Sequence, residues 1–323
     1  MPHDKLMLII NPISGTAGKA GLAEMVVKRL APLGYDIDVR YTTCRGDATR
    51  LARLAVDGGY VGVLAAGGDG TINETARALC GTDVALGIIP AGSGNGLARH
   101  IGIPIDPELS LGVIEQQHIE TVDYGTVNGM EFFCTMGVGF DAAVSHRFAS
   151  KHRRGKLMYV KSAIDEYSDY KPETYTLSAN GEIITRKAFI IAVANASQYG
   201  NNAYIAPEAS ITDGLLDVTV IHAGNPLATA RMGIDMMTGY INKNMLIETF
   251  RTPAVSIYRE DAGPAHIDGE PVELGAVLDI KCHRHSLKVF TLRHKPAFKP
   301  LLTPISSALS DWQIMLRRIF RRR

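Results

Sequence analysis

Apolar and polar positions follow two different periods along roughly the first 120 residues. Short apolar runs, each long enough for one strand, are separated by stretches in which apolar residues recur every three or four positions. This alternation is typical of βαβ units, in which helices cover both faces of a parallel sheet. The pattern predicts strands at residues 6–10, 35–41, 61–66 and 84–89, and helices at 19–33, 47–56 and 73–79.

The pattern changes to short β-rich runs after about residue 122. Asn128-Gly129 and Asn180-Gly181 lie between alternating runs and predict tight hairpins. Helical spacing returns at residues 157–167 and 227–241. We predict a β-sandwich-like region with strands at 123–127, 131–136, 174–179, 182–185, 188–194, 216–222, 254–258 and 277–282.

The 323 residues are enough for two domains, each with its own core. We expect an α/β domain over residues 1–122, with a return of the chain near 286–300, a β-rich domain over 123–285 and a tail over 304–323. The formal charge of +1 gives no indication of a nucleic-acid partner. Four scattered cysteines indicate neither a disulfide framework nor a zinc site. We see no signal peptide and no membrane span, which favours a cytoplasmic protein.

Two glycine-rich turns follow apolar runs in the first domain. Gly67-Gly-Asp-Gly-Thr-Ile-Asn73 comes after residues 61–66, and Pro90-Ala-Gly-Ser-Gly-Asn-Gly96 comes after residues 84–89. Such turns bring backbone N–H groups and a helix N-terminus together, an arrangement that suits a phosphate. Asp69 could hold Mg²⁺ beside that phosphate, or it could cap the following helix.

Two common nucleotide motifs are excluded. A Walker A loop ending at Gly18-Lys19 would need glycine at position 13 and Ser or Thr at position 20, where this chain has Ile13 and Ala20. The Gly92–Gly96 turn has the wrong spacing for a G-x-G-x-x-G dinucleotide fingerprint. A rarer nucleotide site is therefore expected.

Five motifs in order resemble the diacylglycerol kinase catalytic-domain family, which includes bacterial lipid kinases, sphingosine kinases and ceramide kinases. They are Asn11-Pro…Ser14-Gly15, Gly67–Glu74, Ile89–Asn95, Asp213–Asp217 and Asp268-Gly-Glu270. The first domain would then have the parallel α/β fold that NAD kinases and phosphofructokinases share. Gly-Gly-Asp-Gly alone also occurs in those two families, so the Gly-Ser-Gly-Asn turn and the late Asp-Gly-Glu select the lipid branch.

The resemblance implies which residues bind ATP and Mg²⁺. The ATP-binding residues would be Asn11, Pro12, Ser14, Gly15, Thr42, Gly67, Gly68, Asp69, Gly70, Thr71, Asn73 and Ser93. A structural Mg²⁺ would lie around Ser210, Asp213 and Leu215, partly on backbone carbonyls. Without the family, Asp213-Gly214 is better interpreted as a turn.

Asp268 and Glu270 form a candidate catalytic pair. In an extended segment both side chains would share one face, and their repulsion would raise one pKa toward neutrality. Asp-Gly is also a hairpin signal, and spacing alone favours that turn. The resemblance reverses the preference and makes Glu270 the general base with Asp268 supporting it, and Asp69 on the nucleotide side.

Asp141 is a candidate for the lipid head group. It lies in Gly137-Val-Gly-Phe-Asp-Ala-Ala-Val-Ser-His-Arg-Phe148, which is similar to a string in eukaryotic diacylglycerol kinases. Sphingosine kinases also place an Asp near here. The alternative is an N-cap of a helix beginning at Ala142.

The C-terminal tail predicts a basic amphipathic helix. Its apolar face would carry Leu309, Trp312, Leu316, Ile319 and Phe320, and arginines stand at 317, 318 and 321–323. Such a helix suits the surface of an anionic bilayer. The alternatives are a helix docked on the protein and a frayed end.

We therefore predict a cytoplasmic, peripherally membrane-bound lipid kinase that uses ATP and Mg²⁺ on the hydroxyl of diacylglycerol or a related lipid alcohol. A sphingoid-base or ceramide kinase, an NAD kinase and a non-catalytic lipid- or nucleotide-binding relative are the alternatives. A homodimer is left open, as is the identity of the lipid, because one sequence does not reveal the shape of the lipid pocket.

Overall fold

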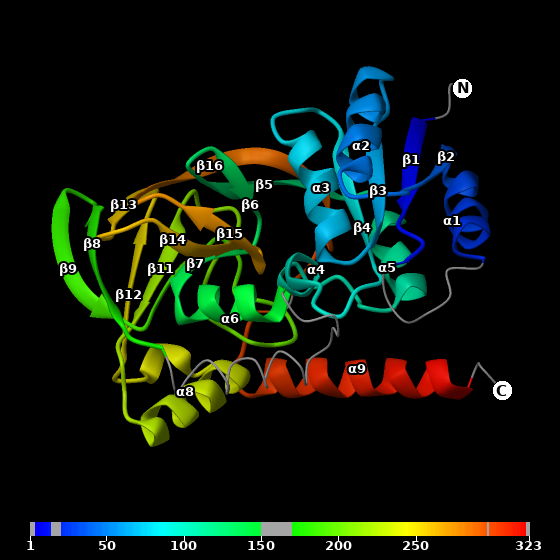
Figure 1. The fold of residues 1–323 in the computed structure, drawn as a ribbon. Helices are drawn as coiled ribbons and strands as arrows, with labels where there is room; N and C mark the ends of the chain where they lie inside the picture. The colour runs from blue at the N-terminus through cyan, green and yellow to red at the C-terminus, as the bar shows by residue number, and fades with distance from the viewer. Residues whose placement is uncertain (1–3, 14–20, 150–169, 296, 321–323) are drawn as a thin grey trace. The chain divides into compact units, whose positions relative to one another are not determined.

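The computed structural model describes residues 4–13, 21–149, 170–295 and 297–320. The chain divides into two compact units (Figure 1). Unit 1 comprises Met1–Val122, His285–Ala297 and Ser306–Arg323, and unit 2 comprises Asp123–Arg284 and Phe298–Ile305. Strand β16 and helix α9 each carry residues of both units.

Unit 1 alternates strands and helices along the chain. Its elements are β1 (Asp4–Ile10), α1 (Leu22–Leu30), a 3-10 turn (Ala31–Leu33), β2 (Tyr35–Tyr41), α2 (Asp47–Asp57), β3 (Gly62–Gly67), α3 (Asp69–Leu79), β4 (Ala85–Pro90), α4 (Gly96–His100), α5 (Pro107–Ile114) and the start of β5 (Ile119–Val127). The strands pair in the order β2-β1-β3-β4, all parallel, and Val289 at the end of β16 (Val277–Phe290) pairs with Leu86.

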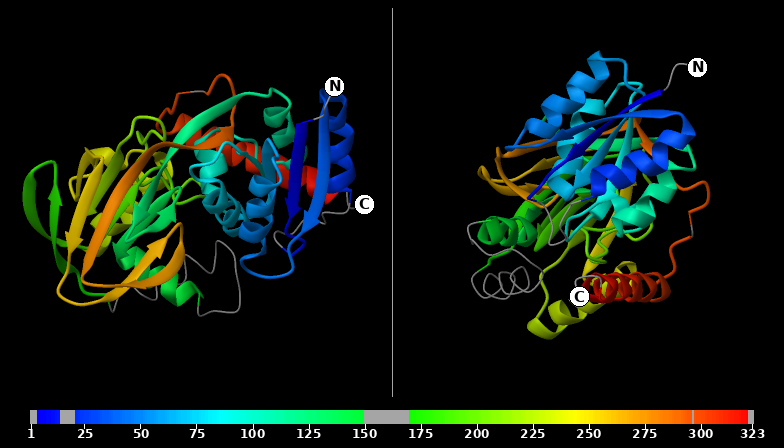
Figure 2. Two further views of the ribbon diagram at one scale, coloured as in Figure 1. Left: turned by 90° about the horizontal axis from the view of Figure 1, so that it is seen from above. Right: turned by 90° about the vertical axis from the view of Figure 1, so that its right-hand side faces the viewer.

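Helices cover both faces of this parallel sheet (Figures 1 and 2). One face buries Leu8 and Leu64 against α1 and α5, through side chains such as Val26 and Leu111. Helices α2 and α3 cover the other face. Because both faces are covered, β3 and β4 are buried along their whole length, and this explains their uninterrupted apolar sequences.

The expected strands and helices of unit 1 are present, with ends shifted by a few residues. Helix α3 begins at Asp69 rather than residue 73, so the first glycine turn enters the helix directly. Helix α5 was not predicted, although Asp106 caps it and Pro107 occupies its first turn. Residues 14–20 lie outside the described part, including the start of the predicted helix at 19–33.

Unit 2 is mostly antiparallel. It continues from β5 through β6 (Met130–Phe132), β7 (Thr135–Gly139), α6 (Phe140–Ala149), β8 (Glu173–Ala179), β9 (Glu182–Ala188), β10 (Ile190–Ala194), β11 (Leu216–Ile221), α8 (Pro226–Thr238), a 3-10 turn (Ile241–Lys243), β12 (Ile247–Thr252), β13 (Ala254–Tyr258), β14 (Gly263–Ile267), β15 (Glu270–Leu274) and β16. Helix α9 (Leu302–Phe320) begins in this unit.

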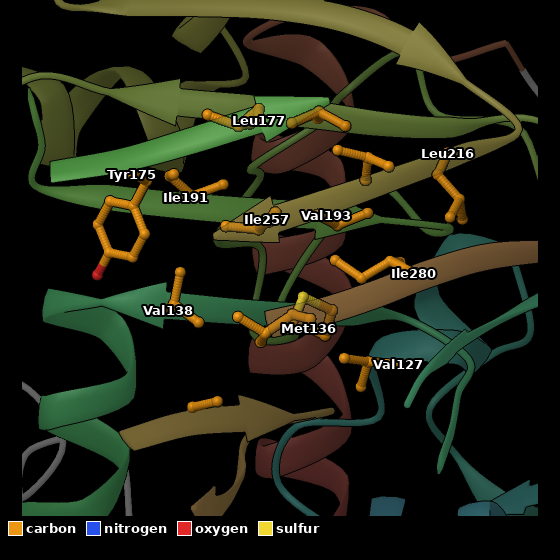
Figure 3. Packing of buried hydrophobic residues seen from close by; sticks show 14 of the residues in the cluster. Val127, Met136, Val138, Tyr175, Leu177, Ile191, Val193, Leu216, Ile257 and Ile280 are labelled. Carbon is orange, nitrogen blue, oxygen red and sulfur yellow. The ribbon is translucent and has the colours of Figure 1, made fainter. Parts of the chain in front are cut away.

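Two sheets of unit 2 enclose one core. One sheet has the order β12-β11-β10-β7-β14-β15, and the other contains β16-β13-β8-β9. Figure 3 shows Val138, Ile191 and Val193 from the first sheet gathered with Ile257 and Ile280 from the second. The predicted α/β domain followed by a β-sandwich-like domain is confirmed.

Several strands of unit 2 differ from the prediction. The expected strand at 131–136 is two strands, β6 and β7, and β16 extends to Phe290 rather than ending at Cys282. Strands β12, β14 and β15 were not predicted. The last two are short and contain Pro264 and Pro271, which weaken a strand pattern. The predicted helix at 157–167 lies outside the described residues.

Polar side chains join the unit 1 part of helix α9 to the rest of that unit. Arg99 donates to both carboxylate oxygens of Asp311, at 3.1 and 2.9 Å, and to the Ser307 hydroxyl at 3.0 Å. Leu309 and Trp312, on the predicted apolar face, are 55% and 56% exposed. The side chains from position 316 onward, including those of Leu316, Ile319 and Phe320, lie outside the described part. Among the described residues, no helix combines the length and apolar character needed to span a membrane.

Candidate functional site

Asp69 ties the two glycine turns of unit 1 together. Its carboxylate accepts hydrogen bonds from the backbone N–H groups of Asn95 and Gly96, both at 2.8 Å. Asn95 and Gly96 begin α4, so Asp69 caps a helix 26 residues further along the chain. The alternative in which Asp69 caps its own helix is wrong, because the residue before α3 is Gly68 and Asp69 is the first residue of α3.

The glycines of these turns are required by close backbone contact. A Cβ atom on Gly92 would lie 2.6 Å from Cα of Gly68, and one on Gly94 would lie 2.6 Å from Oδ2 of Asp69. A Cβ on Gly67 would lie 2.5 Å from the Thr71 side chain. Only glycine lets the two backbones approach this closely. The Gly-Gly-Asp-Gly and Gly-Ser-Gly-Asn motifs therefore form one structural unit.

The turns lie where the parallel strands end. The Asn11 N–H donates to Ala66 O, the Thr42 N–H to Ile10 O and the Ala91 N–H to Gly67 O. These bonds place the residues after β1, β2, β3 and β4 at the carboxyl edge of the sheet, where ligands of open α/β sheets bind. The Asn11 amide also donates to the Thr71 hydroxyl at 3.1 Å, which joins the first loop to α3.

The residues predicted to bind the nucleotide differ in their solvent exposure. Thr42, Thr71 and Asn73 are buried, whereas Gly70 and Ser93 are exposed. Ser14 and Gly15 lie outside the described residues. Of these five residues, Gly70 and Ser93 are therefore the most accessible to a ligand.

Two carboxylates at this edge were not predicted as site residues. Glu74, the last residue of the Gly67–Glu74 motif, accepts from the N–H groups of Gly46 at 2.9 Å and Ala48 at 3.3 Å and so fixes the start of α2. Asp47 accepts from the Thr43 hydroxyl at 2.6 Å and from the N–H groups of Thr43 and Cys44. These bonds hold the pKa of the Asp47 carboxyl well below its usual range, and the bond from the Thr43 hydroxyl has the largest effect. The signal that could have found Asp47 is its place at the start of a predicted helix.

In unit 2, Asp268 and Gly269 form the two-residue turn between β14 and β15. Both have left-handed backbones, with φ of 50° and 79°, as a type I′ hairpin requires. The expectation that Asp268 and Glu270 share one face of an extended segment is wrong. The turn places Glu270 at the start of β15, where it is half-buried.

The Asp268 carboxylate binds three backbone N–H groups. It accepts from the N–H groups of Phe133, Cys134 and Thr135 at 2.9, 2.8 and 3.0 Å. Three such bonds fix the turn against the segment that leads into β7. Asp268 therefore anchors the turn that precedes Glu270.

Asp141 belongs to a buried cluster near this turn. Its Oδ2 accepts from the Tyr199 hydroxyl at 2.9 Å and lies 2.9 Å from Nε2 of His266, and its Oδ1 accepts from the Ala142 N–H. His266 is 1% exposed and Asp141 6% exposed. The N-cap alternative is wrong in position, because α6 begins at Phe140. The head-group role of Asp141 stays a prediction. In the structure its carboxylate contacts Tyr199, His266 and the Ala142 N–H.

The predicted structural metal segment is a turn. Asp213 accepts from the Leu215 N–H at 3.0 Å, and Gly214 has φ of 76°. The Ser210 hydroxyl lies 3.3 Å from that of Thr212. Within the part of the chain that the structure describes, no three His, Cys, Asp or Glu side chains gather as a metal site.

Comparisons with known proteins agree with this architecture. The family model for the diacylglycerol kinase catalytic domain matches residues 5–127, and that for the YegS C-terminal NAD kinase beta sandwich-like domain matches residues 134–291. The chain is 29% identical over 297 residues to a diacylglycerol kinase of Mycobacterium tuberculosis, covering 87% of this chain and 96% of that one.

Two further comparisons extend this result. A protein of Chromohalobacter salexigens named "Probable lipid kinase YegS-like" is 30% identical over 265 residues, which cover 80% of this chain and 85% of that protein. The crystal structure of a diacylglycerol kinase from Bacillus anthracis superposes with a TM-score of 0.71 at 20% identity, covering 91% of this chain and 98% of that one, and this likeness concerns the fold.

The chain belongs to the diacylglycerol kinase catalytic-domain family. The predicted family and the class of lipid kinase are confirmed. Use of ATP follows from membership in a family of kinases.

Proposed function

We propose that this protein is an ATP- and Mg²⁺-dependent lipid kinase that phosphorylates the free hydroxyl of diacylglycerol or a related lipid alcohol. The observation that carries the proposal is the pair of glycine turns joined through Asp69 at the carboxyl edge of a parallel sheet. In a chain of this family, backbone N–H groups gathered at such an edge support a triphosphate site.

The ATP phosphates are assigned to the residues at that edge. Gly70 and Ser93 are the exposed positions in the two turns, and Asn11 joins the first loop to α3. Their partners would be Pro12, Thr42, Gly67, Gly68, Asp69, Thr71 and Asn73, together with Ser14 and Gly15 of the first loop.

Mg²⁺ would neutralise charge on the phosphates. Each oxygen of Asp69 accepts one backbone hydrogen bond, which leaves lone pairs for a cation or for its water shell. Mg²⁺ usually takes one or two carboxylates and keeps several waters, so it needs no dense cluster of ligands. A structural Mg²⁺ at Ser210, Asp213 and Leu215 would rest on one carboxylate and backbone carbonyls.

Glu270 is assigned as the general base. It would accept the proton of the lipid hydroxyl while the new O–P bond forms and the bond between the γ-phosphorus and the bridging oxygen breaks, releasing ADP. Asp268 acts as a positioning residue, because its three backbone bonds fix the turn that precedes Glu270. Asp141 acts at the same turn through His266, whose Nδ1 lies 3.4 Å from the Gly269 nitrogen.

The tail is proposed to reach an anionic bilayer on the cytoplasmic side of the membrane. Leu309 and Trp312 are more than half exposed, and arginines follow at 317, 318 and 321–323. Trp312 is the single tryptophan of the chain. Its fluorescence should therefore shift to shorter wavelength when vesicles containing phosphatidylglycerol are added.

The acceptor is tested by incubating the protein with labelled ATP and, separately, diacylglycerol, sphingosine, ceramide and NAD, and separating the products by thin-layer chromatography. We expect label in diacylglycerol and its loss in Asp69→Ala, with the fold of that variant checked by circular dichroism. Label in sphingosine or ceramide would move the substrate to a sphingoid base or ceramide. Label in NAD would indicate an NAD kinase, and label in no acceptor would indicate a non-catalytic binder. Light scattering of the same sample would show whether it is a homodimer.

A further inference from the structure

Exposed apolar side chains are concentrated in two short segments. Among the described residues, 23 large hydrophobic side chains are exposed, and five of them lie at residues 227–245 and six at 301–315. The two segments thus carry 11 of the 23 in 34 residues. Isolated exposed apolar residues need no explanation, but a concentration of this kind marks an interaction site.

Helix α8 presents a continuous apolar stripe. Leu227, Ala230, Ile234 and Met237 follow one another at intervals of three, four and three residues, so they share one face. The three large side chains of this stripe, Leu227, Ile234 and Met237, are 82%, 63% and 52% exposed. Met232, by contrast, is 6% exposed and belongs to the core beneath the helix. The helix is therefore apolar on both its buried and its exposed sides.

The start of α9 lies beside the end of α8 within the same unit (Figure 1). The Leu301 N–H donates to the Thr238 carbonyl at 2.7 Å, and the centroid of the Phe298 ring lies 4.8 Å from that of Tyr204, with the rings tilted by 51°. These contacts hold the connection in place and leave Leu302 and Ile305 63% and 48% exposed. Met245, in the loop after α8, is 99% exposed.

The charges around this surface are mainly positive. Residues 223–246 and 298–305 contain three basic side chains, Arg231, Lys243 and Lys299, and one acidic side chain, Asp235. The Asp235 carboxylate accepts from the Asn244 amide at 2.7 Å and lies 3.8 Å from Nε of Arg231, whose side chain is 77% exposed. Apolar side chains bordered by basic ones fit an anionic lipid surface.

We propose that the α8 surface, defined as Leu227, Ile234, Met237, Met245, Leu302 and Ile305, docks on an anionic bilayer. This inference rests on the proposed function, because a lipid kinase must meet its substrate at the membrane. It adds a lipid contact on unit 2 to the one expected of the tail. The occupant is the bilayer rather than a second copy of the chain, because the basic side chains bordering the surface would repel those of a second copy.

Vesicle co-sedimentation of the full chain without nucleotide tests the surface. The variant is Ile234→Glu with Met237→Glu, and the matched control is Ile183→Glu, an equally apolar side chain that is 74% exposed on β9. With vesicles of phosphatidylglycerol and phosphatidylcholine, we expect binding of the α8 variant to fall about tenfold or more, because two new negative charges oppose an anionic surface. The control should bind like the unaltered chain.

Each other outcome has a defined meaning. Equal binding of both variants overturns the α8 surface, and so does a monomer produced from a dimer by the α8 changes with vesicle binding unaltered. Because the assay contains no ATP, a chain that binds vesicles through α8 yet phosphorylates no lipid would overturn the proposed function and leave this surface standing. Thermal unfolding of each variant shows that the fold is retained.

A second inference comes from Arg99, whose side chain is 5% exposed. Besides its bonds to Asp311 and Ser307 of α9, Arg99 donates from Nε to the Gly94 carbonyl at 3.0 Å. Gly94 lies in the turn that Asp69 binds. One guanidinium thus joins the tail helix to the second glycine turn by a set of bonds that lysine could not reproduce.

We infer that Arg99 is a positioning residue that couples membrane docking of α9 to ATP binding. This inference also rests on the proposed function. A helix held by a bilayer would restrain Arg99 and, through it, the turn at Gly92–Gly96. Ordering a binding loop in advance raises affinity for its ligand.

Binding of a fluorescent ATP analogue, with and without phosphatidylglycerol vesicles, tests the coupling independently of turnover. For the unaltered chain we expect vesicles to tighten binding by about fivefold or more, the usual lower range of coupling. Asp311→Asn should bind vesicles at least as tightly as the unaltered chain, because it removes an acidic charge, and should lose this effect, whereas Ser310→Ala, on the exposed side of the same helix, should keep it. A vesicle effect that is absent in the unaltered chain, or retained in Asp311→Asn, overturns the coupling.

Discussion

Two hairpins of unit 2 have almost the same backbone and the same glutamate, yet only one belongs to the candidate site. The turn between β8 and β9 reads Asn180-Gly181-Glu182, with φ of 53° and 80°, and that between β14 and β15 reads Asp268-Gly269-Glu270, with φ of 50° and 79°. The Asn180 amide donates one bond, to the Arg251 carbonyl. Asp268 accepts three from residues 133–135.

The difference lies in the surroundings of the turn rather than in the turn itself. Glu182 is exposed, while Glu270 is half-buried and follows a strand that carries the fully buried His266. A local signal such as X-Gly-Glu therefore predicts the hairpin. The role proposed for Glu270 depends on side chains that are distant from it in sequence.

The largest expected effect is on catalysis. Glu270→Gln should lower kcat for lipid phosphorylation by about a hundredfold to ten thousandfold, the range of a general base. Glu182→Gln is the matched control, because it makes the same change in the same position of the other hairpin, and it should keep the activity of the unaltered chain. Initial rates with labelled ATP measure both. Equal rates for the two variants would remove Glu270 from its role.

The next effect is on stability. Asp268→Asn keeps one acceptor oxygen but places an amide NH2 against at least one of the three buried backbone N–H groups, so we expect the free energy of unfolding to fall by about 1–3 kcal/mol. Asn180→Asp loses one exposed hydrogen bond and should cost about 0.5–1.5 kcal/mol. Urea titration compares the two. A larger loss at position 180 would show that Asp268 does not anchor its turn.

The smallest effect tests what the hairpins share. At both Gly269 and Gly181 an added Cβ would meet nothing within 4 Å, so alanine there costs only the left-handed backbone. Gly269→Ala and Gly181→Ala should each lose about 1–2 kcal/mol, and the two losses should agree closely. Urea titration of this pair checks that the turns have equal backbone requirements. A clear inequality would break the comparison.

Sequence alone predicted the fold well where the signal was local. The Asn-Gly pairs predicted the hairpins at 128–129 and 180–181, and the glycine turns were placed correctly after β3 and β4. The close approach of Gly92 to Gly68 was not predictable, because those residues meet only in the folded sheet. For the same reason the backbone bonds of Asp268 were not predictable, since its partners lie more than 130 residues earlier in the chain.

The central claim is that this chain transfers phosphate to a lipid hydroxyl. The most direct test supplies γ-labelled ATP together with diacylglycerol or with the same lipid lacking its free hydroxyl, and follows label into the lipid fraction. We predict label in diacylglycerol and none in the analogue. Label in both lipids would contradict the account, and so would the absence of label from diacylglycerol, sphingosine and ceramide alike while ATP is bound.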